Sequence, residues 1–354
     1  MEKQTRLPII LVSAITLFSV NAFAQHTKNP APSDKIIKTR EDAPAARPRL
    51  NRRGPSTRKK DFWEVSLLNK YSFTTNLIQV SKDEDDKPTN RDDHIYDAIF
   101  GFKMRPLQEK GMKADVDYLF MNRLTADPTN GPYEFYFHQV TADFTPYYTN
   151  RFWGKYELGF NHMSLDEKSY MRKLHFRNIY SWKHAPRWRL DFGPYVSFST
   201  FFQNKAKNGP EVRVEAGETY IFSPKKAGTV GLKLYLGEKD TFDPDSTSPS
   251  SYVFQGAELK ATYMLPWKVI MLPKIKFEHR NYKGMTTAIV PGTTSQTETE
   301  ARKDRKISAG IIFVKRFNKY VTLLVDYKFD TSYSNLESYE YDQHTAGIML
   351  GLKY

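Results

Sequence analysis

The chain has 354 residues, with 14% aromatic and 26% charged residues and no cysteine. The absence of cysteine excludes a disulfide framework, so a large core or a closed sheet must hold the fold. The formal net charge is +13 at pH 7, and most of it lies in residues 26–60, which carry eleven Lys and Arg against three acidic residues. The basic character therefore belongs to one segment and does not describe the whole chain.

The first 24 residues have the pattern of a secretory signal peptide. Lys3 and Arg6 precede an apolar run from Leu7 to Val20, and Ala22-Phe23-Ala24 follows as a cleavage site. The run is short for a membrane-spanning helix of ~20 residues, and it ends in small residues. We therefore expect cleavage before Gln25 and export, and we do not expect nucleic acid as a partner.

Residues 25–60 have the composition of a disordered periplasmic arm. The segment contains five prolines, clustered Lys and Arg, and almost no large apolar side chain. Such a segment cannot bury enough surface to offset the entropy of ordering. Its basic clusters, Arg47–Arg53 and Arg58–Lys60, make an anionic periplasmic partner one candidate and gating of a pore another. A passive tether is the simplest role.

From residue 61 to residue 354 the sequence is a train of alternating segments broken by turn residues. Fourteen strands are predicted, at 62–80, 94–105, 112–123, 134–145, 151–163, 169–182, 187–203, 211–223, 228–239, 251–264, 267–282, 305–316, 319–331 and 341–354. Most have ten residues or more, which suits tilted membrane-spanning strands. We therefore predict an all-β fold, a transmembrane antiparallel up-and-down β-barrel.

The connections between these strands alternate in length. Ser81–Asp93 and Lys283–Asp304 are long, whereas Lys183–Pro186 and Phe317-Asn318 are short. Barrels of bacterial outer membranes have short periplasmic turns and longer external loops, with an even number of strands. The pattern therefore predicts that both ends of the barrel segment lie on the periplasmic side.

Alternation along each strand also assigns the two faces of the sheet. In the last strand, Ala346, Ile348, Leu350 and Leu352 form an apolar row, and smaller or polar residues lie between them. A charge facing lipid costs roughly 2–4 kcal/mol near the midplane, so the charged rows should face inward. The pore-lining candidates are Lys103, Lys155, Arg177, Arg189, Arg213, Lys233, Lys260, Lys274, Lys276, Arg280, Asp115, Asp117, Glu157, Asp191, Glu258 and Asp326.

The five tryptophans supply a separate indication of a membrane boundary. All of them fall at strand ends or turns on the side assigned to the periplasm, and they are Trp63, Trp153, Trp182, Trp188 and Trp267. The indole ring prefers the membrane interface, where its face is half buried and its N–H stays wet. We expect these side chains to form the periplasmic aromatic girdle.

The C-terminal stretch Ser334–Tyr354, SNLESYEYDQHTAGIMLGLKY, resembles the final hairpin of many bacterial outer-membrane barrels. The resemblance implies that Tyr354 is a signal for the barrel-assembly machinery, and that the partners are outer-membrane lipid and lipopolysaccharide of a Gram-negative bacterium. Among fourteen-stranded barrels the chain resembles the OmpG-type monomeric porins. The segment YEYDQ also resembles the terminal hairpin of the surface lipoprotein assembly modifiers, although the tetratricopeptide domain of that family is missing. The fatty-acid transporters are a third comparison, but their hatch is less basic and more apolar than the arm here.

These features favour a porin-like channel for small hydrophilic solutes. Eight strands fill their interior with side chains and sixteen leave a channel, so fourteen should leave a pore. Facing basic and acidic walls would create a transverse field with a slight preference for anions, and Lys274, Lys276 and Arg280 form a basic ladder on one strand. Ordinary cross-strand pairing of these charges is the alternative.

Three other functions stay open at this point. The barrel could serve a polysaccharide or lipoprotein export system, or it could be a structural protein with a closed lumen. An outer-membrane hydrolase would need a nucleophile, a base and an orienting group within hydrogen-bond reach. His175, beside Ser181 and Arg177, and His344 are the best-placed imidazoles for that role, but neither lies in a known motif. We expect no catalytic residues, no metal and no cofactor.

Overall fold

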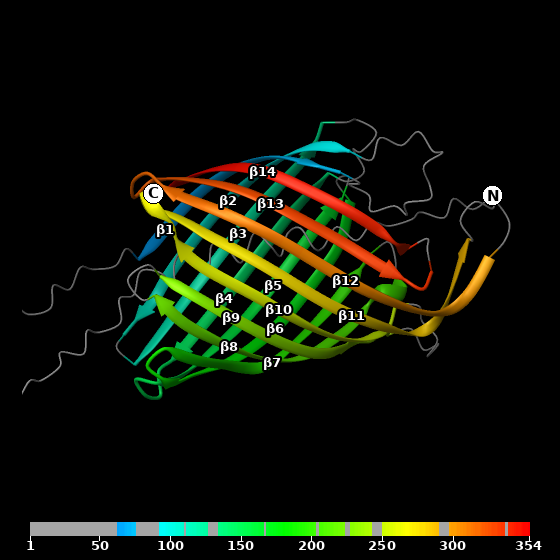
Figure 1. The fold of residues 1–354 in the computed structure, drawn as a ribbon, viewed down its shortest axis with the longest axis horizontal. Helices are drawn as coiled ribbons and strands as arrows, with labels where there is room; N and C mark the ends of the chain where they lie inside the picture. The colour runs from blue at the N-terminus through cyan, green and yellow to red at the C-terminus, as the bar shows by residue number, and fades with distance from the viewer. Residues whose placement is uncertain are drawn as a thin grey trace, which may run out of the picture. The chain divides into compact units, whose positions relative to one another are not determined.

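The computed structural model describes residues 62–75, 92–109, 111–126, 134–165, 168–202, 205–223, 227–242, 250–289, 297–336 and 339–354. The predicted signal peptide and the predicted arm lie outside these residues. Within them the chain forms one closed barrel of fourteen strands, each antiparallel to its two neighbours (Figure 1). None of the helical segments described is long and apolar enough to cross a membrane.

The strands follow the predicted segments closely. Their bounds are β1 Trp63–Thr74, β2 Asp93–Gln108, β3 Met112–Thr125, β4 Phe135–Pro146, β5 Phe152–Leu165, β6 Lys168–Ala185 and β7 Trp188–Phe201. The second half comprises β8 Gly209–Ser223, β9 Gly228–Lys239, β10 Tyr252–Met264, β11 Val269–Ile289, β12 Thr297–Arg316, β13 Val321–Ser334 and β14 Tyr341–Lys353. The number of strands and the fold class predicted from alternation are confirmed.

The barrel closes where the first and last strands pair. The register of β1 with β14 runs from Ser66 opposite Lys353 to Thr74 opposite Thr345. Beyond the last rung, Val65 and Tyr354 exchange two backbone hydrogen bonds of 3.1 and 2.9 Å. Closure removes the free sheet edges, which would otherwise carry unpaired N–H and C=O groups into the membrane.

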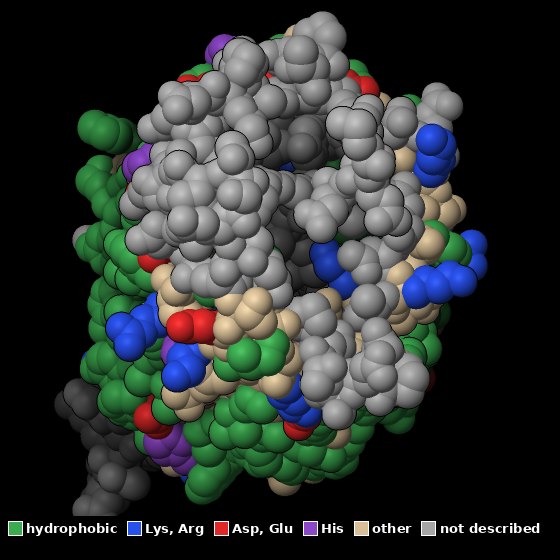
Figure 2. All heavy atoms as spheres, turned by 90° about the vertical axis from the view of Figure 1, so that its right-hand side faces the viewer, with side chains coloured by type: hydrophobic (Ala, Val, Ile, Leu, Met, Phe, Trp, Pro, Cys, Tyr) green, Lys and Arg blue, Asp and Glu red, His purple; other side chains and the backbone are tan. Residues whose placement is uncertain are grey.

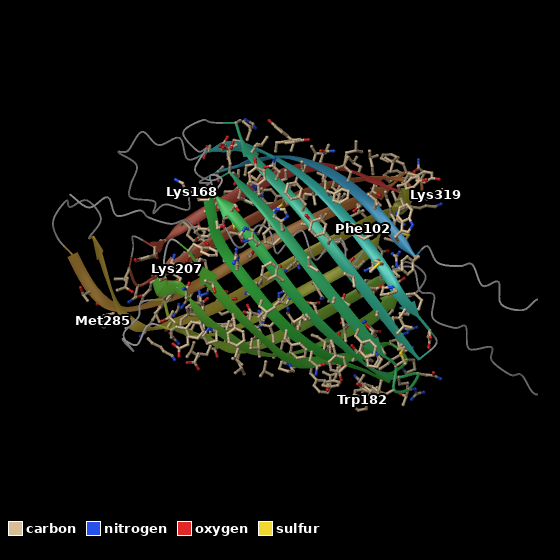
Figure 3. The ribbon with its side chains drawn as sticks, turned by 180° about the vertical axis from the view of Figure 1, so that it is seen from behind. Phe102, Lys168, Trp182, Lys207, Met285 and Lys319 are labelled. Atoms are coloured by element: carbon tan, nitrogen blue, oxygen red, sulfur yellow. The ribbon has the colours of Figure 1, made fainter. Side chains whose placement is uncertain are left out.

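The two faces of the sheet differ as alternation predicts. On β9, Leu232, Leu234 and Leu236 are exposed on the outside, whereas Lys233 and Tyr235 between them point inward. Exposed, outward apolar residues of this kind occur on thirteen of the fourteen strands, and Phe102 in Figure 3 is one of them. An exposed apolar belt of this extent requires a lipid solvent, so the barrel is a transmembrane one.

The two ends of the barrel have different connections. At one end, which holds the first residue of β1 and the last of β14, the strands are joined by connections of two to five residues. We call this the short-connection end. At the opposite, long-connection end, eighteen residues join β1 to β2 and twelve join β9 to β10. Only two residues join β5 to β6 there, so the length alternation has an exception.

One predicted connection is wrong in the structure. Lys283–Asp304 was expected to be a loop, but β11 continues to Ile289 and β12 begins at Thr297. The two extensions pair with each other from Met285–Ala301 to Ile289–Thr297, after a register shift that follows Asn281. The hairpin projects beyond its neighbours (Figure 1), because β10 begins opposite Tyr282 and β13 ends opposite Asp304. The threonine-rich sequence of this segment suits an extended strand as well as a loop.

Candidate pore and its charged inner wall

All sixteen predicted pore-lining residues lie on the inward-facing rows of their strands. Lys233 lies between the outward Leu232 and Leu234, and Lys276 lies between the outward Ile275 and Phe277. The same alternation holds for the other fourteen candidates. The barrel therefore gathers on one curved surface residues that are up to 223 positions apart in the chain, from Lys103 to Asp326.

A belt of ion pairs runs around one half of the inner wall. Arg177 on β6 reaches over β7 to pair with Glu215 on β8. Lys233 lies between Glu215 and Glu258, with its Nζ 3.8 and 3.7 Å from their carboxylate oxygens. Lys274 pairs with Glu258 at 3.0 Å. Five consecutive charges thus alternate in sign between β6 and β11.

The other half of the wall shows the same mixing of charges. Lys103 Nζ lies 2.9 Å from Asp117 and 3.7 Å from Asp115. Lys155 Nζ lies 3.1 Å from both Asp143 and Glu157. Acidic and basic side chains are therefore neighbours around the wall. The interpretation with separate, facing basic and acidic walls is wrong, because cross-strand neighbours neutralise each other locally.

Much of this wall is accessible to water. The side chains of Lys155 and Asp117 keep 39% and 38% of their surface exposed although both belong to ion pairs. Arg189 and Lys276 are exposed to a similar extent. Charged side chains that retain this much exposed surface are not completely packed against their neighbours inside the barrel.

Tyrosines also lie on the inner wall, and they were not among the predicted pore-lining residues. The guanidinium of Arg213 lies 4.4 Å from the ring centre of Tyr195, and the hydroxyl of Tyr235 donates to Glu278 at 2.8 Å. Asp143, Arg302 and Asp304 also point inward and were not among the candidates. Alternation would have identified Tyr195 and Tyr235, because they share rows with Asp191 and Lys233, which were selected.

Four of the five tryptophans face outward or lie exposed at the short-connection end. Trp63, Trp182, Trp188 and Trp267 are all exposed, and Figure 3 shows Trp182 at this end, as it does Lys319. Trp153 is the exception, because it shares the inward row of Lys155 and Glu157. Its ring lies 6.5 Å from that of Tyr147, with which it also forms an isolated β-bridge. Trp153 therefore does not face outward as expected, and a girdle formed by the other four tryptophans stays a prediction.

Solved structures of several outer membrane proteins are similar to this chain. The chain is similar to OpdK, an outer membrane protein of Pseudomonas aeruginosa, with a TM-score of 0.42, 8% identity and coverage of 82% of this chain and 99% of that chain. OccAB3 of Acinetobacter baumannii has a TM-score of 0.43 and 9% identity, covering 82% and 99%. OmpT, an outer membrane protein of Vibrio cholerae, has a TM-score of 0.43 and 9% identity, covering 85% and 100%. No family model matches the chain, and no curated protein matches it.

The two imidazoles considered for hydrolysis have other neighbours. His175 points inward, with its Nε2 3.3 Å from Glu157, and Gly159 leaves the space that the imidazole occupies. Ser181 is not its partner, because that hydroxyl donates to Asp191 at 2.6 Å. His344 lies on the outward face and bonds to the hydroxyl of Tyr327 at 2.7 Å. The structure thus brings neither histidine together with a nucleophile that was proposed for it.

Two further predictions concern metals and assembly. Among the residues that the structure describes, no three His, Asp or Glu side chains gather as metal ligands. Tyr354 lies at the seam of the barrel, where its ring is 6.0 Å from that of Trp63. Its role as an assembly signal stays a prediction, as do the partners of the barrel.

Proposed function

We propose that the protein is a porin-like channel of a Gram-negative outer membrane, through which small hydrophilic solutes diffuse passively. One observation carries the proposal. A closed fourteen-stranded barrel presents an apolar outer surface and a charged inner wall on which paired side chains remain exposed to water. The first surface suits lipid, and the second suits an aqueous path through it.

The size of the barrel supports an open path. Interiors of eight-stranded barrels are filled by side chains, whereas barrels of sixteen or more strands leave an aqueous channel. Figure 2 looks onto the long-connection end and shows a hollow with basic side chains in view on its wall. A closed structural barrel would be expected to carry an apolar or fully packed interior instead.

The charges of the wall support a slight preference for anions. Ten of the sixteen candidates are basic and six are acidic. Because the pairs alternate in sign, the excess acts as a weak bias and not as a strong field. Solutes with a negative charge should therefore pass somewhat faster than cations of the same size.

Planar-bilayer recording of the purified protein tests this function. Insertion should produce stepwise ohmic conductance in KCl, and a salt gradient should give a reversal potential of the sign expected for chloride preference. Folded protein that inserts without conductance would overturn the channel and favour a structural or export role. A reversal potential of the opposite sign would remove only the anion preference.

A further inference from the structure

Basic side chains outnumber acidic ones where β11 and β12 line the lumen toward the long-connection end. Lys276 and Arg280 on β11 and Arg302 and Lys306 on β12 all point inward. Glu278 and Asp304 lie between these cations on the same rows, and Glu300, further out on the row of β12, accepts a hydrogen bond from Asn335 at 3.0 Å. We call the four basic residues together with Glu278 and Asp304 the basic cluster. It contains four cations and two carboxylates, unlike the alternating belt elsewhere on the wall.

Both carboxylates of the basic cluster are already engaged. Glu278 accepts hydrogen bonds from Arg280 Nε at 2.7 Å and from the hydroxyl of Tyr235 at 2.8 Å, and Lys276 Nζ lies 2.8 Å away. Asp304 accepts two bonds from Arg302, at 2.8 and 2.6 Å, and a third from Tyr282 at 3.1 Å. Each carboxylate therefore already has three partners within hydrogen-bond distance.

Lys306 is the one cation of the basic cluster that forms no hydrogen bond with either carboxylate. Its Nζ is buried, and no acceptor for it exists among the residues that the structure describes. Its closest aromatic neighbour is Tyr341, with the ring centre 5.8 Å from Nζ. Arg280 and Arg302 both act on it electrostatically, and so do the carboxylates of Asp304 and Glu278. A buried ammonium among other cations is costly unless an anion compensates it.

Neighbouring elements that the structure describes add further cations to this part of the wall. Lys239 on β9 and Arg280 lie on the same aromatic ring, that of Tyr252, at 6.0 and 4.9 Å from its centre. Lys207, in the short helix η2 (Lys205–Lys207), lies outside the spanning strands, and burial together with the nearby Arg302 lowers its pKa. On the other side, the carboxylate of Asp330 is taken by Lys328 and by Ser308.

We propose that the basic cluster is a binding site in the lumen for the oxyanion group, carboxylate or phosphate, of a polyhydroxylated organic solute. Arg280 supplies a planar pair of donors, and Lys306 supplies the charge that the anion neutralises. The rings of Tyr252, Tyr282 and Tyr341 border the cluster and offer flat faces to a sugar-like body. The proposal deepens the channel function and rests on it.

Block of the chloride current by gluconate tests the site, with glucose 6-phosphate as a second probe and glucose as the uncharged control. Gluconate or glucose 6-phosphate should reduce single-channel current in a saturable manner, and glucose should not. Whichever of the two binds more tightly identifies the group, carboxylate or phosphate. Replacing Lys306→Met should raise the half-blocking concentration about tenfold, which corresponds to about 1.4 kcal/mol.

Lys328→Met is the matched control, since it removes the same charge from the next strand, where Asp330 already compensates it. Its half-blocking concentration should stay within twofold of the original protein. Equal block by glucose, or unchanged block in Lys306→Met, would overturn the site while leaving the channel intact.

A protein without conductance would overturn the channel itself, and thermal unfolding in detergent then tests the site. Gluconate should raise the Tm of the original protein and leave that of Lys306→Met unchanged. Without gluconate, Lys306→Met should unfold at a higher temperature, because it buries no uncompensated charge. Equal ligand shifts in both proteins would contradict the proposal.

Discussion

Single residues of the inner wall fall into two kinds of ion pair. Arg123 and Asp97 are sealed from water, with 7% and 1% of their side-chain surface exposed, and the guanidinium donates twice to the carboxylate at 2.7 and 3.0 Å. Lys103 and Asp117 form the other kind, since Asp117 keeps 38% of its surface exposed. The two kinds should differ in what they contribute to stability.

We expect Asp97→Asn to lower the free energy of unfolding by about 3–5 kcal/mol, because it leaves the Arg123 guanidinium buried without a counter-charge. Asp117→Asn, the matched control, should cost no more than about 1 kcal/mol, because water screens that pair. Urea unfolding in lipid vesicles, followed by tryptophan fluorescence, gives both values. Equal losses in the two variants would contradict the distinction between sealed and hydrated pairs.

The face of each residue could be predicted from the sequence, but its partner could not. Alternation has a period of two, so one apolar row fixes the direction of every side chain on its strand. Pairing depends on the stagger between strands, and Arg177 reaches Glu215 two strands away. Trp153 was misplaced because residue type and position at a strand end were used for it instead of the row.

At the scale of elements, the hairpin of β11 and β12 has two different parts. From Tyr282 and Asp304 toward the short-connection end, β11 and β12 each pair with a neighbour on both sides. In the outer part, from Met285–Ala301 to Ile289–Thr297, the two strands pair only with each other. Figure 3 labels Met285, which forms the first of these outer rungs with Ala301. The outer part therefore contributes no pairing to the barrel wall.

Replacing residues 285–301 with Asn-Gly should leave the barrel folded. Asn-Gly favours the chain reversal needed between Gly284 and Arg302, and every rung shared with β10 or β13 is retained. Resistance to SDS at room temperature and the conductance step in bilayers should stay within twofold of the original values. Loss of the folded band on a gel would show that the outer rungs stabilise the wall.

The sequence could not distinguish this hairpin from a loop. The first predicted strand ended at position 282 and the next began at position 305, because the apolar alternation is absent between them. Strands that extend beyond the membrane do not face lipid, so they need no apolar row. Strand pairing can continue without an apolar row, because backbone hydrogen bonds and β-branched residues suffice. Extensions of this kind leave little trace in a hydrophobic pattern.

For the molecule as a whole, the count of fourteen strands came from turn residues and alternation alone. An even number brings the ends of the first and last strands to the same end of the barrel, and the observed β1–β14 pairing closes the wall there. The distribution of charge over the inner surface follows from the stagger of all fourteen strands together. For that reason the alternating belt and the basic cluster became visible only in three dimensions.

Labelling of single cysteines on β9 tests the central claim, a hydrated lumen inside a lipid-facing wall, most directly. The chain has no cysteine of its own, so each introduced thiol reports alone. In proteoliposomes a charged, membrane-impermeant maleimide should modify Lys233→Cys, and it should leave Leu232→Cys and Leu234→Cys unmodified. Modification of all three positions, or of the leucine positions alone, would contradict the assigned faces, and protection of Lys233→Cys would contradict the open lumen.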